Sequence, residues 1–274
     1  MIPEGIIPPV LTPLTREQDV DQEAFCRLLD KLIAGGVHGL FIAGTAGFGS
    51  ILTDAQHEWT VRLAVRHVAG RLPVLSGVLE PSTARVLERI RRIESSGVLA
   101  VVVVAPYYLR AQNERQLLRH FEIIRESTNL EMVLYNLPGC VGTAIPVQVF
   151  GDMAKRGWIS ACKDSSGDSE YFSELCRRGA ENGLRVYQGM RPVFATLVEL
   201  GAAGCVPVPG NVFPELYVQA WNKRTEQAEL PGLQERCDQA WKDLVVGTDF
   251  FSRSLRRLAE EGLGAGVMPE PFSA

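Results

Sequence analysis

The sequence predicts an α/β protein, a (β/α)₈ barrel with a C-terminal helical extension. Short runs rich in Val and Ile alternate with longer segments that have helical spacing of apolar residues and frequent charges. One of these runs, residues 101–104, is apolar at every position, as expected for a parallel strand that is covered on both faces. The strand-then-helix unit recurs eight times, and eight such units predict a closed barrel.

Eight apolar runs are the predicted strands, and each is bounded by turn-forming residues. They are residues 6–11, 39–43, 73–77, 100–105, 132–135, 159–163, 185–188 and 204–208. Seven segments between them have the spacing of amphipathic helices, several after Ser, Thr or Asp and before Gly. These predicted helices are residues 21–34, 54–69, 83–95, 114–126, 146–155, 169–178 and 192–200.

After Pro214 the strand pattern stops, and three further helices are predicted over residues 215–229, 233–246 and 249–261. We therefore divide the chain into a barrel domain, residues 1–213, and a helical extension, residues 214–274. A Gly- and Pro-containing tail from Gly262 is expected to be loose. The competing doubly wound sheet would require a glycine fingerprint after the first strand, and the TPLT sequence at residues 12–15 is not one.

Composition excludes several classes of function. The 274 residues are 46% hydrophobic and 22% charged, and the formal net charge is −4 with Lys and Arg spread thinly. No basic patch is present for nucleic acid or an anionic membrane surface, so a small-molecule partner is expected. The six cysteines form no CxxC pair and no zinc-ligand spacing, so we expect reduced thiols, no metal and no cofactor.

Neither a signal peptide nor a membrane span is expected from the sequence. The amino terminus has an early Glu4 and several prolines instead of a basic segment followed by an apolar one. The uncharged stretch 132–151 is interrupted by Asn, Pro and Gly. We therefore expect a cytoplasmic protein.

Three polar positions follow predicted strands, at the barrel end where function is expected. The GTAGFG loop, residues 44–49, offers backbone N–H groups and the Thr45 hydroxyl to a carboxylate or phosphate, although a tight turn explains its glycines equally well. Tyr135 ends the fifth strand and has the alternative of an ordinary core tyrosine. Lys163 ends the sixth strand and has the alternative of a lysine that only extends to water.

Lys163 suggests a specific chemistry because a desolvated lysine can lose its proton and attack a carbonyl carbon to form an imine. Asp164 would have to point away from it. Neighbouring strands five and six would bring Tyr135 beside Lys163, and Thr45 would add a hydroxyl from strand two. An imine-forming lysine, a phenolic proton shuttle and a carboxylate cradle form a coherent set.

The chain resembles the family of dihydrodipicolinate synthase and N-acetylneuraminate lyase. Six motifs occur in the family's order along nearly the whole barrel. They are GIIPPVLTP at residues 5–13, GTAGFG at 44–49, APYY at 105–108, YNLPG at 135–139, KDSSG at 163–167 and GAAGCV at 201–206. The resemblance implies a lysine-dependent lyase or aldolase that acts on pyruvate or another 2-oxo acid, as a homotetramer or homodimer, without metal or cofactor.

The resemblance also implies roles for individual residues. Lys163 would form the Schiff base, Tyr135 would transfer protons, and Thr45 would link Tyr135 to a relay and help to hold the carboxylate. In the synthase branch a tyrosine of the neighbouring subunit completes that relay, and Tyr108 matches it. The implied substrate-binding residues are Ala46, Gly47, Cys140 and Val206, the last through its backbone carbonyl.

Two departures from the family pattern affect substrate binding. Family members commonly have a hydroxyl residue and then Gly-Glu where this chain has Ala46, Gly47 and Phe48, so one carboxylate contact is missing. The lysine-pathway synthase has an arginine at the position of Cys140, and a thiol cannot replace the paired contact of a guanidinium.

These observations predict a Schiff-base lyase or aldolase that joins or cleaves pyruvate, or a 2-keto-3-deoxy acid, and an aldehyde. Dihydrodipicolinate synthase activity and dehydration of a sugar-derived 2-oxo acid are alternatives within the same chemistry. A degenerate barrel that only binds a 2-oxo acid is the non-enzymatic alternative, favoured by Ala46 and Phe48 and opposed by Lys163, Tyr135 and Thr45.

Overall fold

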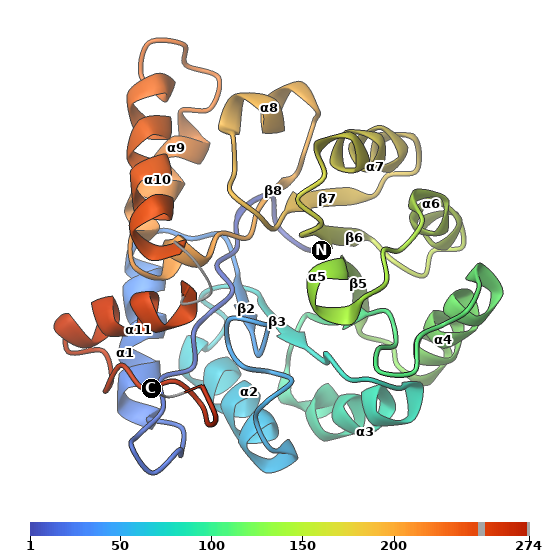
Figure 1. The fold of residues 1–274 in the computed structure, drawn as a ribbon, viewed down its shortest axis with the longest axis horizontal. Coiled ribbons are helices and arrows are strands. Elements are labelled where there is room, and N and C mark those ends of the chain that lie inside the picture. Colours follow the sequence, from blue (N-terminus) through green and yellow to red (C-terminus); the bar gives the residue numbers. More distant parts are fainter. Residues whose placement is uncertain (246–249, 273–274) are drawn as a thin grey trace.

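A computed structural model of the chain describes residues 1–245 and 250–272, and it confirms the predicted barrel. Eight parallel strands of these residues form one sheet in the order β1-β8-β7-β6-β5-β4-β3-β2. The sheet closes between β1 and β2, since Phe41 N–H donates to the Pro8 carbonyl at 3.1 Å and Val10 N–H donates to the Phe41 carbonyl at 2.8 Å. Figure 1 shows the helices arranged around this closed ring of strands.

Each predicted strand overlaps an observed one. The strands are β1 (Gly5–Ile6), β2 (Leu40–Ile42), β3 (Val74–Gly77), β4 (Ala100–Val104), β5 (Glu131–Asn136), β6 (Ala161–Asp164), β7 (Arg185–Gln188) and β8 (Gly204–Cys205). β1 and β8 are shorter than predicted because the prolines that follow them, Pro8 and Pro207 among them, have no N–H to donate to a strand ladder.

The predicted helices form with small shifts at their ends. They are α1 (Gln22–Ala34), α2 (Asp54–Val68), α3 (Thr83–Ile93), α4 (Glu114–Ser127), α6 (Val147–Lys155), α7 (Ser169–Glu181) and α8 (Phe194–Glu199). Thr53, Asn113 and Asp168 accept backbone N–H bonds as N-caps, as polar residues at helix starts predict. The short helix α5 (Pro138–Val141) was not predicted, because a single turn has no periodic signal.

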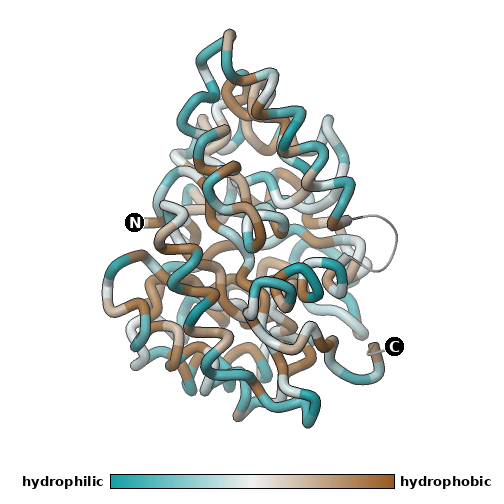
Figure 2. Tube along the Cα trace, turned by 90° about the vertical axis from the view of Figure 1, so that its left-hand side faces the viewer, coloured by the Kyte–Doolittle hydropathy of each residue, from teal (hydrophilic) through white to brown (hydrophobic). Residues whose placement is uncertain are grey.

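The core lies inside the barrel and between the strands and their helices. All four valines of residues 101–104 are at most 2% exposed, which confirms that both faces of β4 are covered. Figure 2 shows hydrophobic stretches in the interior and hydrophilic ones mainly at the periphery. The barrel therefore presents an apolar floor to any polar group at the end of a strand.

Three helices make up the C-terminal extension: α9 (Pro214–Asn222), α10 (Leu230–Val245) and α11 (Phe250–Glu260). The prediction extended the first helix too far, to residue 229, and the predicted ends at Val246 and Asp249 lie outside the described residues. The expectation of a loose tail is wrong for the residues described. Val267 pairs with Leu14 in an antiparallel bridge, and Glu270 N–H donates to the Gln18 side chain at 2.9 Å.

No helix in the described parts of the chain combines the length and the apolar character that a membrane crossing requires.

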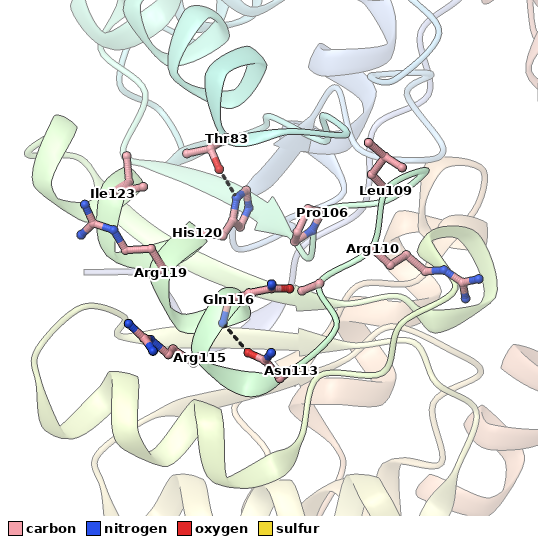
Figure 3. A pocket seen from close by; sticks show the side chains of 11 residues that line it. Thr83, Pro106, Leu109, Arg110, Asn113, Arg115, Gln116, Arg119, His120 and Ile123 are labelled. Atoms are coloured by element: carbon pink, nitrogen blue, oxygen red, sulfur yellow. Dashed lines mark hydrogen bonds between the residues drawn. The ribbon is translucent and has the colours of Figure 1, made fainter.

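Two buried histidines lie between the barrel and its outer helices. His57 is bonded through Nε2 to the Gly77 carbonyl at 2.7 Å, and His120 is bonded to Thr83 at 2.8 Å and to the Val104 carbonyl at 3.3 Å. Figure 3 shows the His120–Thr83 bond at the edge of a surface pocket. The pKa of each histidine is lowered from 6.5 to about 4, chiefly by burial, and for His57 the nearby Arg89 charge contributes to this shift.

We expect acid to destabilise this fold through the two histidines. In the unfolded chain they take up protons near pH 6.5, whereas in the fold they do so only near pH 4. Between these values the unfolded state binds more protons, so the free energy of unfolding falls as pH falls, by up to about 1.4 kcal/mol per pH unit for each histidine. Urea denaturation across this pH range measures the slope.

The variant His120→Gln isolates the effect of one histidine. The unfolding free energy of this variant should fall less steeply as pH falls than that of the parent protein. The part of the slope that the two histidines cause should be reduced by about half. Comparing the two proteins cancels the contribution of carboxyl groups such as Asp164 to the slope of stability against pH. Burial raises the pKa of Asp164, so its contribution to that slope has the opposite sign. Parallel slopes for the two proteins would contradict the assignment.

Candidate active site

Lys163 and Tyr135 meet at the carboxyl end of the barrel. They are register partners on β6 and β5, and the Lys163 ammonium lies 4.1 Å from the centroid of the Tyr135 ring. A second ring, that of Phe41 on β2, has its centroid 5.2 Å from the same nitrogen. Lys163 is only 6% exposed, so aromatic faces replace much of the water around its charge.

The adjacent carboxylate turns away from Lys163. Asp164 accepts hydrogen bonds from the Asn136 amide at 2.7 Å and from the Ser166 hydroxyl at 2.9 Å, on the opposite side of the strand. Within residues 1–245 and 250–272, no carboxylate lies within ion-pair distance of Lys163. The Lys163 nitrogen is therefore not held in an ion pair with any described carboxylate.

Gly189 leaves the space in which Lys163 lies. A Cβ atom at this position would be 2.6 Å from Cε of Lys163 and 2.1 Å from Oγ of Ser165, closer than real contacts allow. The sequence analysis did not identify this residue. Its signal was a glycine directly after the seventh strand, which pairs with the strand that carries the lysine.

Three hydroxyl-bearing residues, Thr45, Tyr135 and Ser165, line the same cavity as the lysine. The Tyr135 hydroxyl is 3.2 Å from the Ser165 hydroxyl, a partner that the sequence analysis missed although it belongs to the KDSSG motif. The buried Thr45 hydroxyl has no hydrogen-bond partner among the described residues. Tyr135 therefore bonds Ser165 instead of Thr45, and Thr45 is left with an unused hydroxyl beside the cavity.

The loop after β2 is held rigidly at the mouth of the barrel. The buried guanidinium of Arg89 donates to the Gly49 carbonyl and, at 3.1 Å, to the Leu52 carbonyl. It also pairs with the buried Glu80 carboxylate at 2.5 Å. The loop that carries Thr45 is thus fixed by an ion pair on its outer side.

The residues of this loop have different surroundings. Ala46 faces the cavity, whereas Gly47 is packed against the segment that follows β1, where its carbonyl accepts from Thr12 at 2.8 Å. Phe48 is buried with a left-handed backbone at φ 60°, and its ring meets Phe251 of α11 edge to face at 6.1 Å between centroids. The loop and the C-terminal extension are therefore in direct contact.

A cavity of about 270 Å³ lies above Lys163. It brings together Lys163, Tyr135, Thr45, Ala46 and Cys140 from the predicted site. Its complete lining is Pro9, Thr45, Ala46, Tyr135, Leu137, Cys140, Lys163, Ser165, Gly189, Met190, Val208, Trp241 and Phe251. Sequence patterns gave no signal for Met190, Trp241 and Phe251, since the last two come from helices of the extension.

Three predicted residues do not line this cavity, and Gly47, which packs behind the loop, is the first of them. Val206 lines a separate void of about 20 Å³ inside the barrel, which Lys163 also borders. Tyr108 does not line the cavity; its side chain is 93% exposed, and its backbone has the left-handed φ of 67°. Within the described residues no group of three or more His, Cys, Asp or Glu side chains is placed to hold a metal ion.

Comparison with known proteins identifies the relatives of the chain. The model of the dihydrodipicolinate synthetase family matches residues 2–273. The 4-hydroxy-tetrahydrodipicolinate synthase of Phenylobacterium zucineum is 32% identical over 242 residues, which cover 88% of this chain and 79% of that protein. The enzyme of the same name from Xylella fastidiosa is 34% identical over 213 residues, or 78% of this chain and 70% of that protein.

Solved structures agree with this relationship. Dihydrodipicolinate synthase from Bacteroides thetaiotaomicron superposes with a TM-score of 0.92 at 29% identity, covering 98% of this chain and 93% of that one. A prophage protein of the dihydrodipicolinic acid synthase family from E. coli K12, solved in complex with pyruvate, has a TM-score of 0.92 at 26% identity, with 98% and 92% of the two chains covered.

The buried Arg89–Glu80 pair yields a prediction for stability. The variant Arg89→Met leaves the Glu80 carboxylate with less compensation and frees two loop carbonyls, so we expect a loss of about 3–5 kcal/mol in unfolding free energy. The matched variant Arg85→Met removes a half-exposed guanidinium from the same carboxylate and should cost about 1 kcal/mol or less. Urea denaturation of both variants is the measurement. Equal losses would show that burial of Arg89 is not the decisive factor.

Proposed function

Because this chain belongs to the dihydrodipicolinate synthetase family, we propose that it is a class I lyase or aldolase. It makes or cleaves a carbon–carbon bond between pyruvate, or a 2-keto-3-deoxy acid, and an aldehyde, through an imine on Lys163. The observation that carries the proposal is a buried lysine with no carboxylate partner, lying against Tyr135 at the base of a cavity. The pyruvate complex of the E. coli prophage protein supports the choice of 2-oxo acid.

The reaction begins when the neutral amine of Lys163 attacks the ketone carbon of the 2-oxo acid. Loss of water gives the imine, whose nitrogen withdraws electrons from the bond to be broken. Cleavage releases the aldehyde and leaves an enamine that takes up a proton before hydrolysis. Tyr135, bonded to Ser165, is the group that transfers these protons.

The substrate carboxylate is held by the loop after β2. The unpartnered Thr45 hydroxyl and the backbone N–H of Ala46 are the donors that this role requires. Gly47 supports the loop from behind through its contact with Thr12, and Val206 lies below the lysine. The Arg89 ion pair keeps these donors in position.

A second candidate is 4-hydroxy-tetrahydrodipicolinate synthase itself, the name that the curated relatives carry. It uses the same imine chemistry but condenses pyruvate with aspartate semialdehyde. Cys140 opposes this candidate, since its thiol cannot form the paired contact that a guanidinium makes with a carboxylate. Consumption of aspartate semialdehyde distinguishes the two.

The active unit is proposed to be a homodimer or homotetramer. Tyr108 and Leu109 are 93% and 83% exposed and lie outside the cavity of their own chain, as expected for residues that reach a neighbour. We place the protein in the cytoplasm, in keeping with its six cysteines, all within the described ranges and all free thiols.

Borohydride reduction with pyruvate tests the imine. We expect intact mass and peptide mapping to locate one adduct on Lys163, because only an imine is reduced to a stable secondary amine. Lys163→Ala should give no adduct and lose turnover by orders of magnitude, whereas Lys155→Ala, an exposed lysine on α6, should behave like the parent. A Lys163→Ala protein that keeps full turnover would refute the mechanism. If the parent protein forms no adduct with any 2-oxo acid, the result would favour the alternative of a degenerate barrel that only binds a 2-oxo acid.

Subunit mixing tests the role of Tyr108. If Tyr108 acts on the neighbouring site, Tyr108→Phe should lower kcat by about 100-fold, the scale of a lost proton-transfer group. Mixed oligomers of Tyr108→Phe and Lys163→Ala subunits should regain activity, since each intact lysine then meets an intact tyrosine. A mass of 30.1 kDa by light scattering with full activity would exclude the proposal.

A further inference from the structure

The residues that line the cavity above Lys163 form two groups, which differ in chemistry and in the parts of the fold that carry them. Its polar groups, Thr45, Tyr135, Lys163 and Ser165, come from the ends of strands β2, β5 and β6. The remaining lining comes from loops and from the extension, and its only polar side-chain groups are the Cys140 thiol and the Trp241 indole N–H. Those residues are Pro9, Ala46, Leu137, Cys140, Gly189, Met190, Val208, Trp241 and Phe251.

We propose that the acceptor part of this cavity takes an uncharged, apolar aldehyde, with an aromatic aldehyde as the best fit. The inference rests on the proposed function and names the class of its second substrate. The carboxylate of the imine would bind the polar groups at the strand ends. The acceptor would then contact the hydrocarbon, thioether and aromatic side chains of the cavity.

The charges around the cavity exclude an anionic acceptor. Lys163 is the only cation among the described residues that line it, and the imine uses that nitrogen. Arg191, which borders the neighbouring pocket behind Met190 and Trp241, is paired with Asp238 at 2.9 Å. Arg110 donates to the Gly142 carbonyl at 2.8 Å. A carboxylate on the acceptor would therefore lose water without gaining a cation.

Size and ring placement favour an aromatic acceptor. An apolar cavity of ~150 Å³ accommodates benzene, so about 270 Å³ leaves room for a ring beside a three-carbon imine. Phe251 is held by its edge-to-face contact with the buried Phe48, so one aromatic wall is already fixed before the acceptor binds. Pairing of aromatic rings adds stabilisation beyond the area that they bury.

The proposed step balances without an added oxidant or reductant. The protonated pyruvate imine on Lys163 loses a methyl proton to the Tyr135 oxygen and becomes an enamine, and the enamine carbon forms a bond to the aldehyde carbon. The electron pair of the C=O bond moves to oxygen, which takes a proton from Tyr135. Water then hydrolyses the iminium, releasing a 4-hydroxy-2-oxo acid and the free lysine. The reverse sequence releases the aldehyde and pyruvate.

The test compares acceptors after the imine has been verified. Borohydride trapping with pyruvate comes first, and the same preparation is then given benzaldehyde, 3-methylbutanal, glyceraldehyde and aspartate semialdehyde, with products identified by mass. We expect kcat/KM for benzaldehyde to exceed that for aspartate semialdehyde by about 100-fold, as for a charge that has no partner in a site. The value for 3-methylbutanal should fall between them.

Three variants test whether residues of the cavity determine the preference for an aromatic aldehyde. Cys140→Arg supplies a cation and should raise kcat/KM for aspartate semialdehyde about 10-fold while lowering that for benzaldehyde. Trp241→Leu removes an aromatic wall and should raise KM for benzaldehyde about 10-fold, with pyruvate trapping measured in parallel to report on the lysine site. Trp59→Leu, on the outer surface of α2, is the matched control and should change neither value.

The outcomes separate the inference from the function on which it rests. Absence of any imine with pyruvate overturns the proposed function and the inference together. An imine combined with a preference for aspartate semialdehyde or glyceraldehyde overturns only the inference. Benzaldehyde kinetics that are identical in Trp241→Leu and the parent would likewise overturn it, since the aromatic wall would then not contact the acceptor.

Discussion

The structure depends on one constraint, a lysine held at the mouth of an apolar barrel without a carboxylate to neutralise it. Below Lys163 lie apolar side chains such as Val102 and Val133, and beside it lies the face of Tyr135. The carboxylate oxygens of Asp164, the acidic residue nearest to Lys163 in sequence, accept hydrogen bonds from Asn136 and Ser166. A lysine nitrogen that no described carboxylate holds in an ion pair is the group to which we assign the attack on a ketone.

The walls of the site come from parts of the chain that are far apart in sequence. The loop after β2 is fixed on its outer side by the Arg89–Glu80 pair and on its inner side by the contact between Phe48 and Phe251. Through that contact the C-terminal extension becomes part of the cavity instead of a separate appendage. The lining of the cavity is thus divided, with polar groups at the strand ends and aromatic side chains, Trp241 and Phe251, from the extension.

How far the sequence could predict this arrangement differs between residues. Lys163 and Tyr135 were found because each is a polar residue at the end of an apolar run, and neighbouring parallel strands must bring such ends together. Ser165 and Gly189 were missed although both carried a local signal, a motif hydroxyl and a glycine after a strand. Trp241 and Phe251 carried none, because an aromatic residue on an amphipathic helix has the same pattern whether it faces a core or a cavity.

The barrel, the order of its elements and the lysine at the end of the sixth strand could be predicted from the sequence alone, since these depend on periodicity and on residue types that are local along the chain. Only the tertiary structure decided the direction of Asp164, the bond of Tyr135 to Ser165 and the apolar wall from the extension. It also showed that Gly47 packs behind the loop and that Tyr108 points away from its own site. These features are contacts between distant segments, and their geometry exists only after the chain has closed into a barrel.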